Sequence, residues 1–248
     1  MRWRSSVIPT DLLVRPAVSE DLDELTTLLE VTRRAAEPDI PPLRQDTTAV
    51  RAFLEARTAI GDVWVAQEDQ LVGFAVITRD WLHSLYVGPQ HQGRGIGQVL
   101  LELVKAQRPG GFGLWVFAAN ESARGFYRRH GLLELEHTDG SGNDEGAPDV
   151  RMVWPGEEPL SGLRRWIDEI DADLAELLAR RFALTAAVQG EKRRLGDSAG
   201  PAARDPQREQ EIVARMVAHS PGLEADRVTR VMDVIIGESL EEWERRPD

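Results

Sequence analysis

The sequence predicts an α/β domain followed by an all-α domain, and two features of the chain support this division. As far as Trp154, short runs of β-branched and aromatic residues alternate with stretches in which apolar residues recur at helical spacing. From Ser161 to Leu195 the chain lacks proline, and its apolar residues keep helical spacing. Between these regions, residues 155–159 read PGEEP, which has the composition of a linker. We therefore predict domains at 1–156 and 157–248.

Composition and charge exclude several classes of protein. The 248 residues carry a net charge of -12, which argues against nucleic acid or an anionic membrane as a partner. The absence of cysteine excludes disulfides and thiolate catalysis, and the five histidines are scattered, so we expect no metal. No apolar run has the length of a membrane span, and residues 1–10, an expected irregular leader, lack the apolar core of a signal peptide. We expect a cytoplasmic protein.

Strands and helices alternate along the first domain. The β-rich runs predict strands at 12–17, 61–67, 71–78, 81–87, 113–118, 132–137 and 150–154, with a hairpin between the second and the third. Amphipathic spacing predicts helices that begin at Ser19, at Thr47, near Ile96 and after Asn120. Ser19 and Asn120 can cap helix N-termini, and Gly131 is suited to the end of the last helix. The strands are expected to form one sheet.

A glycine-rich turn between a strand and a helix marks the first candidate site. The strand ends at Val87, and the hexapeptide QGRGIG at 92–97 leads into the helix. At such a junction, free backbone N–H groups and the positive end of the helix dipole favour a phosphate, and glycine lets it approach the backbone closely. Neither the three-glycine dinucleotide fingerprint nor the Gly-Lys-Ser/Thr ending of a P-loop is present.

Two motifs in this domain resemble those of the GNAT family of acetyl-CoA-dependent N-acetyltransferases. The first is the frame Gln-x-x-Gly-x-Gly at 92–97, which follows a strand. The second is Asn-x-x-Ala-x-x-Phe-Tyr-x-x-x-Gly at 120–131. The resemblance covers roughly residues 12–154. It implies a mixed, mostly antiparallel sheet flanked by helices, acetyl-CoA as the acetyl donor and an amine as the acceptor.

The same resemblance implies roles for individual residues. The backbone of Leu85 and Val87 would hydrogen-bond the pantetheine arm as an added strand does, and Asn120 would brace the cofactor. The other implied cofactor-binding residues are Gln92, Gly93, Arg94, Gly95, Ile96 and Gly97. Tyr127 would protonate the departing CoA thiolate, and core packing beside Phe126 is the alternative interpretation of this phenol.

Three features of the sequence bear on the acceptor amine. His83 is the candidate general base, because an unperturbed imidazole titrates near pH ~6.5, and a half-buried structural histidine is the alternative. The connection 35–46 corresponds to a region that closes over the acceptor in GNAT-like enzymes, or it is an ordinary surface loop. Acidic residues near the last strand either attract a cationic amine or are merely solvated: Asp144, Glu145 and Asp149.

The second domain begins with a very long helix. At 1.5 Å per residue, the helix from Ser161 to Leu195 is about 50 Å long, more than the residues that remain can bury as a compact monomer, so it requires a partner chain. Arg181 and Lys192 fall on its apolar stripe. A buried cation without a carboxylate partner is costly, which suggests an anionic ligand. Asp205 is expected to cap a second helix, and a third covers about 224–244.

These three helices resemble the all-helical AroQ class of chorismate mutases. The pattern Leu-Arg-x-x-Ile-Asp-x-Ile-Asp-x-x-Leu-x-x-Leu-Leu-x-x-Arg begins at Leu163, and Arg-Asp-x-x-Arg-Glu begins at Arg204. The resemblance implies an intertwined homodimer that binds a chorismate-like dianion. A Claisen rearrangement of chorismate to prephenate needs no nucleophile. It needs a dianion held in a compact conformer, with a cation at the oxygen that gains negative charge.

The implied mutase site is rich in cations. Its catalytic residues would be Arg164 (from the partner chain), Arg181, Lys192, Arg208 and Glu209, with Asp205 and Ser239 nearby. The arginines would hold the substrate carboxylates, the lysine the ether oxygen and the glutamate the ring hydroxyl. Solvated helix arginines are the alternative, an interpretation that we apply to Arg165 and Arg204. Trp243 stands where the family carries a Gln or Glu, and an indole cannot be ionised.

The sequence therefore predicts a bifunctional homodimer with two small-molecule substrates. One activity would transfer an acetyl group from acetyl-CoA to an amine, and the other would convert chorismate to prephenate in aromatic amino acid biosynthesis. In an alternative, the helical domain is a non-catalytic dimerisation or aromatic-acid-sensing module, which burial of Trp243 in the pocket would favour. In another, the mutase acts on an amino-substituted chorismate.

Overall fold

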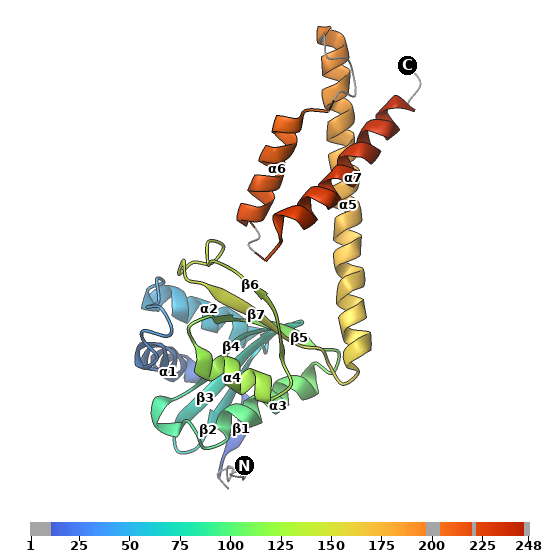
Figure 1. Ribbon diagram of the computed structural model, residues 1–248. Helices are drawn as coiled ribbons and strands as arrows, with labels where there is room; N and C mark the ends of the chain where they lie inside the picture. The colour runs from blue at the N-terminus through green and yellow to red at the C-terminus, as the bar shows by residue number, and fades with distance from the viewer. Residues whose placement is uncertain (1–10, 197–203, 220–221, 246–248) are drawn as a thin grey trace. The chain divides into compact units, whose positions relative to one another are not determined.

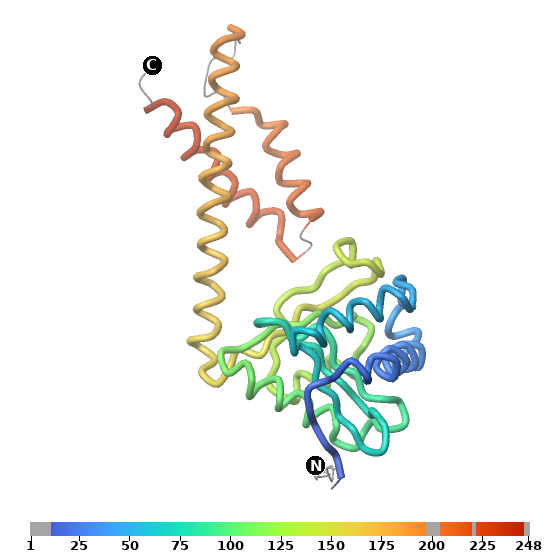
Figure 2. Tube along the Cα trace, turned by 180° about the vertical axis from the view of Figure 1, so that it is seen from behind, coloured from blue at the N-terminus to red at the C-terminus, as the bar shows by residue number. Residues whose placement is uncertain are grey.

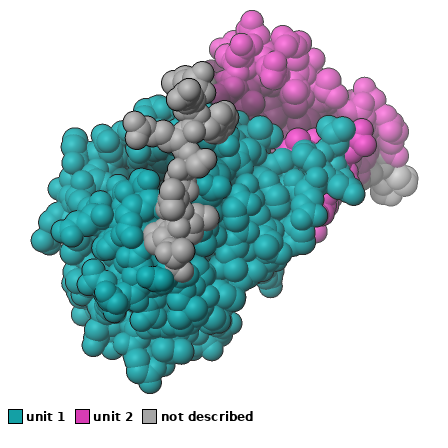
Figure 3. All heavy atoms as spheres, turned by 90° about the horizontal axis from the view of Figure 1, so that it is seen from below, with its two compact units in different colours: residues 1–162 teal, residues 163–248 magenta. Residues whose placement is uncertain are grey.

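The computed structural model describes residues 11–196, 204–219 and 222–245. The chain divides into two compact units, residues 1–162 and residues 163–248 (Figure 3). The predicted domain boundary between residues 156 and 157 stays a prediction. The expected leader at 1–10 lies outside the described residues.

Unit 1 is built on a seven-stranded sheet in the order β1-β2-β3-β4-β5-β7-β6. The strands are β1 (Leu13–Pro16), β2 (Val63–Gln67), β3 (Leu71–Thr78), β4 (Trp81–Val87), β5 (Phe112–Phe117), β6 (Leu133–His137) and β7 (Asp149–Trp154). Neighbouring strands pair antiparallel except β4 and β5, which are parallel. The expected mixed, mostly antiparallel sheet is therefore confirmed.

Helices cover both faces of this sheet (Figures 1 and 2). They are α1 (Leu22–Ala35), α2 (Thr47–Ala59), α3 (Ile96–Gln107) and α4 (Glu121–Arg129), with 3-10 turns η1 (Ser19–Asp21) and η2 (Pro89–His91). The helices α1 and α2 share a core with β2 and β3, where Leu25, Leu54 and Phe74 are fully buried. On the other face, α3 and α4 share a core with strands β2 to β5 and β7. Each fully buried leucine contributes about 1.5–3 kcal/mol.

The start of α1 differs from the prediction. Ser19 lies in the 3-10 turn η1 and does not cap the helix. Asp21 instead accepts hydrogen bonds from the Val18 N–H (2.8 Å) and from two guanidinium nitrogens of Arg15 (2.7 and 2.8 Å). The hydrogen bonds from Arg15 hold the pKa of Asp21 below its usual value. This ion pair with β1 fixes the entrance of the helix, so α1 begins at Leu22.

The described residues of unit 2 form three helices, α5 (Pro159–Leu195, which begins in unit 1), α6 (Pro206–His219) and α7 (Ala225–Glu244). The expected all-helical class is confirmed, and α5 begins two residues before the predicted Ser161. The helices α6 and α7 pack through a small apolar core centred on Val228, Met232 and Ile236. In both views α7 crosses the later half of α5 (Figures 1 and 2).

An exposed row of apolar residues runs along α5, and we call it the α5 seam. Its members are Ile170, Leu174, Leu177, Leu184, Val188 and Leu195, each between 47% and 72% exposed. They are separated by three, four or seven residues, so they share one side of the helix, as in a helix that packs along another helix. Within the described part of this chain, α6 and α7 leave the α5 seam in contact with solvent.

Candidate functional site

The two parallel strands of unit 1 are unpaired with each other along most of their length. β4 and β5 pair at one register position, Trp81 with Gly113. Beyond it, the described strands show no further pairing, so the edges of both strands that face each other keep backbone groups available as far as Val87 and Phe117. A free strand edge can pair with an extended ligand. Leu85 and Val87, assigned to the pantetheine arm, lie on this edge.

The glycine turn follows directly at the end of β4. Gly93 and Gly95 have φ of +73° and +84°, the left-handed conformation that favours glycine, and Gly95 is the N-cap of α3. The first hydrogen bond of the helix joins the Val99 N–H to the Gly95 carbonyl (3.1 Å). The N–H groups before Val99 therefore lie ahead of the helical hydrogen-bond ladder. Gln92 donates from Nε2 to the Val87 carbonyl (3.1 Å) and joins the turn to β4.

Three other residues of this motif have structural partners. The Arg94 guanidinium donates to both carboxylate oxygens of Glu68 (2.7 and 3.2 Å), which lies between β2 and β3. Ile96 is buried in the core. A Cβ at Gly97 would lie 3.6 Å from the Phe126 ring, so the first motif packs against the second.

His83 occupies an irregular position on β4. Ser84 pairs with Val76 and Leu82 with Ile77, so His83 is the extra residue of a β-bulge. Its Nε2 lies 2.7 Å from the Thr78 hydroxyl. Burial and the nearby Arg57 lower the pKa of His83, which keeps the imidazole neutral near pH 7 and able to accept a proton.

Tyr127 lies on α4 with its side chain in the sheet core, 8% exposed. Burial, with a smaller effect of Tyr86, raises the pKa of Tyr127, so the phenol holds its proton throughout the physiological range. Its ring lies 5.3 Å from the ring of Phe126, as the packing interpretation requires. No hydrogen bond or ring contact joins Tyr127 to His83 among the described residues. These facts are compatible with a proton donor and with a core phenol alike.

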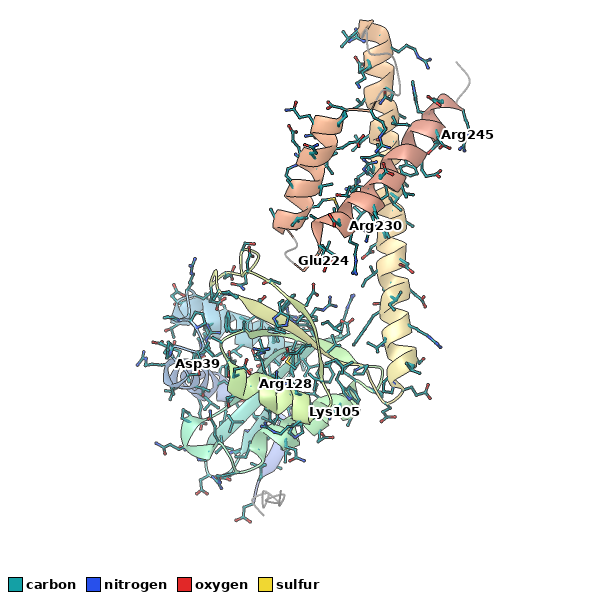
Figure 4. All side chains as sticks on the ribbon, viewed as in Figure 1. Asp39, Lys105, Arg128, Glu224, Arg230 and Arg245 are labelled. Atoms are coloured by element: carbon teal, nitrogen blue, oxygen red, sulfur yellow. The ribbon has the colours of Figure 1, made fainter. Side chains whose placement is uncertain are left out.

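Both ends of α4 are fixed as the sequence predicted. Asn120 accepts a hydrogen bond at Oδ1 from the Ala123 N–H (3.0 Å) and caps the helix, and Gly131 follows its C-terminal end with a φ of +83°. Lys105 of α3 donates to the carbonyl of His130 (2.9 Å), which ties the end of α4 to α3 (Figure 4).

The loop between β6 and β7 corrects the interpretation of its acidic residues. Asp149 is buried in β7 and accepts hydrogen bonds from the Thr138 hydroxyl and from Asn143 Nδ2 (3.0 Å). Asp144 lies 3.3 Å from the Gln45 amide nitrogen. Glu145 is paired with Arg33 (2.9 Å), a residue that the sequence analysis did not single out. Asp149 and Glu145 are thus engaged within the fold, whereas Asp144 is exposed, as the solvated interpretation expects.

In unit 2 the structure joins two residues of the predicted mutase set. Arg181 on α5 donates from Nη1 to the Ser239 hydroxyl on α7 (3.2 Å). Burial lowers the pKa of Arg181, and no described carboxylate offsets this effect. Lys192, three turns further along α5, is also half-buried. Arg181 therefore contacts α7 without a described carboxylate partner, which favours an anionic ligand, whereas the place of Lys192 in this site stays a prediction.

The remaining members of the set have partners of their own or lie apart from the Arg181–Ser239 contact. Glu209 accepts two hydrogen bonds from Arg204 (both 2.8 Å), which also pairs with Asp233 on α7 (2.6 Å). Arg204 is exposed, as the interpretation of a solvated arginine expects, and it also pairs with carboxylates of α6 and α7. Asp205 caps α6 through the Arg208 N–H (3.0 Å), as predicted. The Arg208 side chain pairs with Glu211, and Arg164 is exposed on α5, apart from the other residues of the set.

Trp243 packs against α5. Its ring lies under the Arg193 guanidinium at 4.9 Å, and a Cβ at Gly190 would lie 3.8 Å from the indole. Trp243 follows Ser239 by one helical turn on the same face of α7 and is half-buried. The indole therefore lies one turn of α7 from the Arg181–Ser239 contact.

The described residues contain neither a cluster of metal ligands nor a membrane-spanning helix. No group of three or more metal-ligating side chains is placed to hold a metal ion. No described helix is both long enough and apolar enough to cross a bilayer.

Comparison with known families identifies both units. Residues 59–131 match the acetyltransferase (GNAT) domain, and residues 163–243 match chorismate mutase type II. The chain thus contains a GNAT acetyltransferase domain and a type II chorismate mutase domain, and both are families of enzymes. The two family resemblances seen in the sequence are confirmed.

Individual relatives cover the first unit. The chain is 28% identical over 95 residues to the peptidyl-lysine N-acetyltransferase YjaB of Salmonella typhimurium and 34% identical over 85 residues to its Escherichia coli counterpart. These matches span 38% and 34% of the chain, and 65% and 54% of the two relatives. Among solved structures, yncA of Salmonella typhimurium, described with its cofactor acetyl-CoA, aligns with a TM-score of 0.50 at 21% identity. It covers 60% of this chain and 96% of its own, which supports the fold of unit 1.

Proposed function

We propose that the chain is a bifunctional enzyme, an acetyl-CoA-dependent N-acetyltransferase and a chorismate mutase. The observation that carries the first activity is the free edge of β4, which runs directly into a glycine turn at the N-terminus of α3. An extended pantetheine arm fits the strand edge, and a pyrophosphate fits the N–H groups of the turn. The proposed cofactor residues remain Leu85, Val87, Gln92, Gly93, Arg94, Gly95, Ile96, Gly97 and Asn120.

The proposed acetyl transfer is a direct attack. The amine nitrogen forms a bond to the thioester carbonyl carbon, and the bond from that carbon to sulfur breaks. His83, neutral near pH 7, takes the proton that the amine loses, and Tyr127 supplies a proton to the departing thiolate. At this raised pKa the Tyr127 phenol holds its proton throughout the physiological range, which a proton donor requires.

The first test is release of CoA from acetyl-CoA in the presence of amines. A thiol-reactive chromophore reports only CoA, because the chain has no cysteine. One acceptor to include is a peptidyl lysine, on which the YjaB relatives act by name. Tyr127→Phe should lower kcat about 100-fold or more and leave the calorimetric affinity for acetyl-CoA unchanged. An unchanged kcat would remove Tyr127 from the proposed chemistry.

The observation that supports the proposed mutase activity is the environment of Arg181. This half-buried guanidinium has a hydroxyl, and no described carboxylate, as its partner, which favours an anionic ligand. In the proposal, Arg181 and Arg208 hold the carboxylates of chorismate and Lys192 faces the ether oxygen, while Arg164 comes from the partner subunit. Glu209 would bind the ring hydroxyl while Arg204 holds its carboxylate.

The α5 seam supports a homodimer, the assembly proposed for this protein in the cytoplasm. Six apolar side chains at the spacing of a helix–helix contact stay exposed in the single chain. A second α5 packed along the seam would bury them and would bring Arg164 toward the site of its partner. Size-exclusion chromatography with light scattering would detect the dimer.

The contacts of Trp243 favour a second candidate, a helical unit that binds an aromatic-pathway acid without converting it. The indole, packed against α5 beside Arg193, is bulkier than the Gln or Glu of the family and cannot act as an acid. Chorismate consumption separates the two candidates. Turnover by the wild type supports the mutase. Calorimetric binding without turnover, converted to turnover by Trp243→Gln, supports the sensing module. A mutase for an amino-substituted chorismate would consume that compound and leave chorismate unchanged.

A further inference from the structure

The structure places a buried arginine at the mouth of the acetyltransferase site, and the proposed mechanism gives it no task. Arg33, on the last turn of α1, is 8% exposed. Its guanidinium lies over the Phe117 ring, 5.5 Å from the centroid, at the end of β5. It also faces the hydroxyl of Tyr86 on β4. Arg33 therefore spans the opening at the ends where β4 and β5 are furthest from their pairing point.

The partners of Arg33 come from the two loops that flank this opening. Its Nη2 donates to the Pro41 carbonyl (2.9 Å) in the α1–α2 loop and to Glu145 Oε1 (2.9 Å) in the β6–β7 loop. Burial alone would lower the pKa of Arg33, but Tyr86 and Glu145 outweigh it and the pKa is raised. The guanidinium is thus charged at every physiological pH.

The hydrogen-bonding capacity of Arg33 is not filled. A guanidinium has five N–H donors, and the Nε of Arg33 is buried without a hydrogen-bond partner among the described residues. An unpaired buried donor is costly, and a planar guanidinium matches a carboxylate through two parallel hydrogen bonds. Glu145 approaches a single guanidinium nitrogen, Nη2, within hydrogen-bond distance. A second carboxylate in the opening would find Nε available.

Tyr86 connects Arg33 with the elements of the proposed acetyltransferase site. Tyr86 faces Arg33 and is near enough to Tyr127 to raise the pKa of that phenol. Tyr86 lies on β4 between Leu85 and Val87, so Arg33 faces the strand whose edge is proposed to bind the pantetheine arm. A small acceptor held by Arg33 at one end can therefore extend toward the thioester with the other.

We propose that Arg33 binds a carboxylate of the acetyl acceptor, so that the acceptor is an amine that also carries a carboxylate. Glu145 occupies one nitrogen of Arg33, and the acceptor carboxylate displaces it or binds beside it at Nε. This inference rests on the proposed acetyltransferase activity and assigns its substrate class. In this proposal Glu145 of the β6–β7 loop competes with the carboxylate of the acceptor for Arg33, and the loop does not serve to attract a cationic amine.

The test compares acceptors that differ in a single charged group. CoA release is measured with the twenty α-amino acids, with their carboxamides and with a capped peptide that contains one lysine. The best amino acid should exceed its carboxamide at least tenfold in kcat/KM. Equal rates for acid and amide, acetylation of the lysine peptide without any amino acid, or no release from any of these amines would each overturn the proposed acceptor class.

Variants then locate the preference. Arg33→Gln should abolish the preference for the amino acid over its carboxamide, because KM rises for the acid and changes little for the amide. The matched control Arg34→Gln, at an exposed residue of the same turn, should keep this preference. Glu145→Gln should lower KM for the acid several-fold because the internal competitor is lost. A preference that survives Arg33→Gln would refute the role of Arg33, and the Glu145 variant tests it even if Arg33→Gln does not fold. Failure to bind acetyl-CoA in calorimetry would instead refute the acetyltransferase proposal itself.

Discussion

Dimerisation through the α5 seam can be tested at Leu184. This side chain is 62% exposed in the single chain and lies in the middle of the seam, between Leu177 and Val188. If a second α5 packs along the seam, Leu184 passes from water into an interface in both protomers. Leu184→Ala should then weaken the dimer without unfolding the chain, because the leucine makes few contacts within its own unit.

The size of the effect follows from the exposed area. Leu→Ala removes three carbons, worth about 0.8 kcal/mol each when fully buried, or about 2.4 kcal/mol. Scaled by the 62% that dimerisation can cover, the loss is about 1.5 kcal/mol per protomer, or about 3 kcal/mol for the symmetric pair. At 1.4 kcal/mol per tenfold change, the dimer dissociation constant should rise about 100-fold.

The assay is sedimentation equilibrium over a range of protein concentrations. Leu160→Ala is the matched control, because Leu160 is 71% exposed but lies about 120° from Leu184 around the helix. Its dissociation constant should stay within about twofold of the wild type. A wild-type protein that is monomeric at micromolar concentration, or a Leu184→Ala dimer as tight as the wild type, would refute the interface.

Three further predictions concern unit 1. Arg57→Gln removes a cation that lowers the pKa of His83, so the acid limb of the kcat/KM profile, below pH 6.5 in the wild type, should move to higher pH; a fixed limb would mean that His83 is not the base. Gly95→Ala places a Cβ at a φ of +84°, and calorimetry should show an acetyl-CoA affinity about tenfold lower. Asp21→Asn should lower the free energy of unfolding by about 2 kcal/mol at pH 7 in urea titrations. Because the folded-state pKa of Asp21 is lowered, this contribution is complete above pH 3.8 and disappears as pH falls through the folded-state pKa, so a pH-independent difference would contradict the ion pair with Arg15.

The sequence predicted those features of the fold that local patterns encode. β4 has its predicted bounds, Trp81–Val87, because alternating apolar residues and flanking turns define a strand locally. Asn120 and Gly131 bound α4 as expected, since caps depend on one side chain and one backbone angle. The long α5 was predicted from a helical apolar pattern uninterrupted by proline.

Features that depend on distant residues could not be predicted in this way. The pairing of Asp21 with Arg15 displaced the start of α1 from Ser19, although serine is the better capping residue on local grounds. Arg33 meets Glu145 across 112 positions of sequence, and no local pattern relates the two. The pairing of Arg204 with Glu209 joins residues only five positions apart, so the local sequence could have indicated it. The contact of Arg204 with Asp233 could not be predicted locally, because it requires the packing of α6 on α7.

The roles of the site residues were predicted from family motifs, and the structure supplies the environment of each. It leaves Tyr127 with two compatible interpretations, a proton donor and a packed phenol, because both require a buried, protonated ring. The surroundings of His83 favour one interpretation more clearly. This bulge residue lies beside the Thr78 hydroxyl, and burial and Arg57 lower its pKa, so the imidazole is neutral near pH 7 and can act as a base.

The central claim, two independent enzymes in one chain, is tested most directly by assaying one preparation for both reactions. Wild type, Tyr127→Phe and Arg181→Ala are each measured for CoA release with the best acceptor amine and for chorismate consumption. Each variant should lose one reaction and keep the other. Tyr127→Phe loses acetyl transfer and keeps chorismate turnover, while Arg181→Ala loses at least about 100-fold of chorismate turnover and keeps acetyl transfer. A folded wild-type dimer that binds acetyl-CoA but leaves chorismate unchanged would contradict the claim and leave the helical unit as a dimerisation or sensing module.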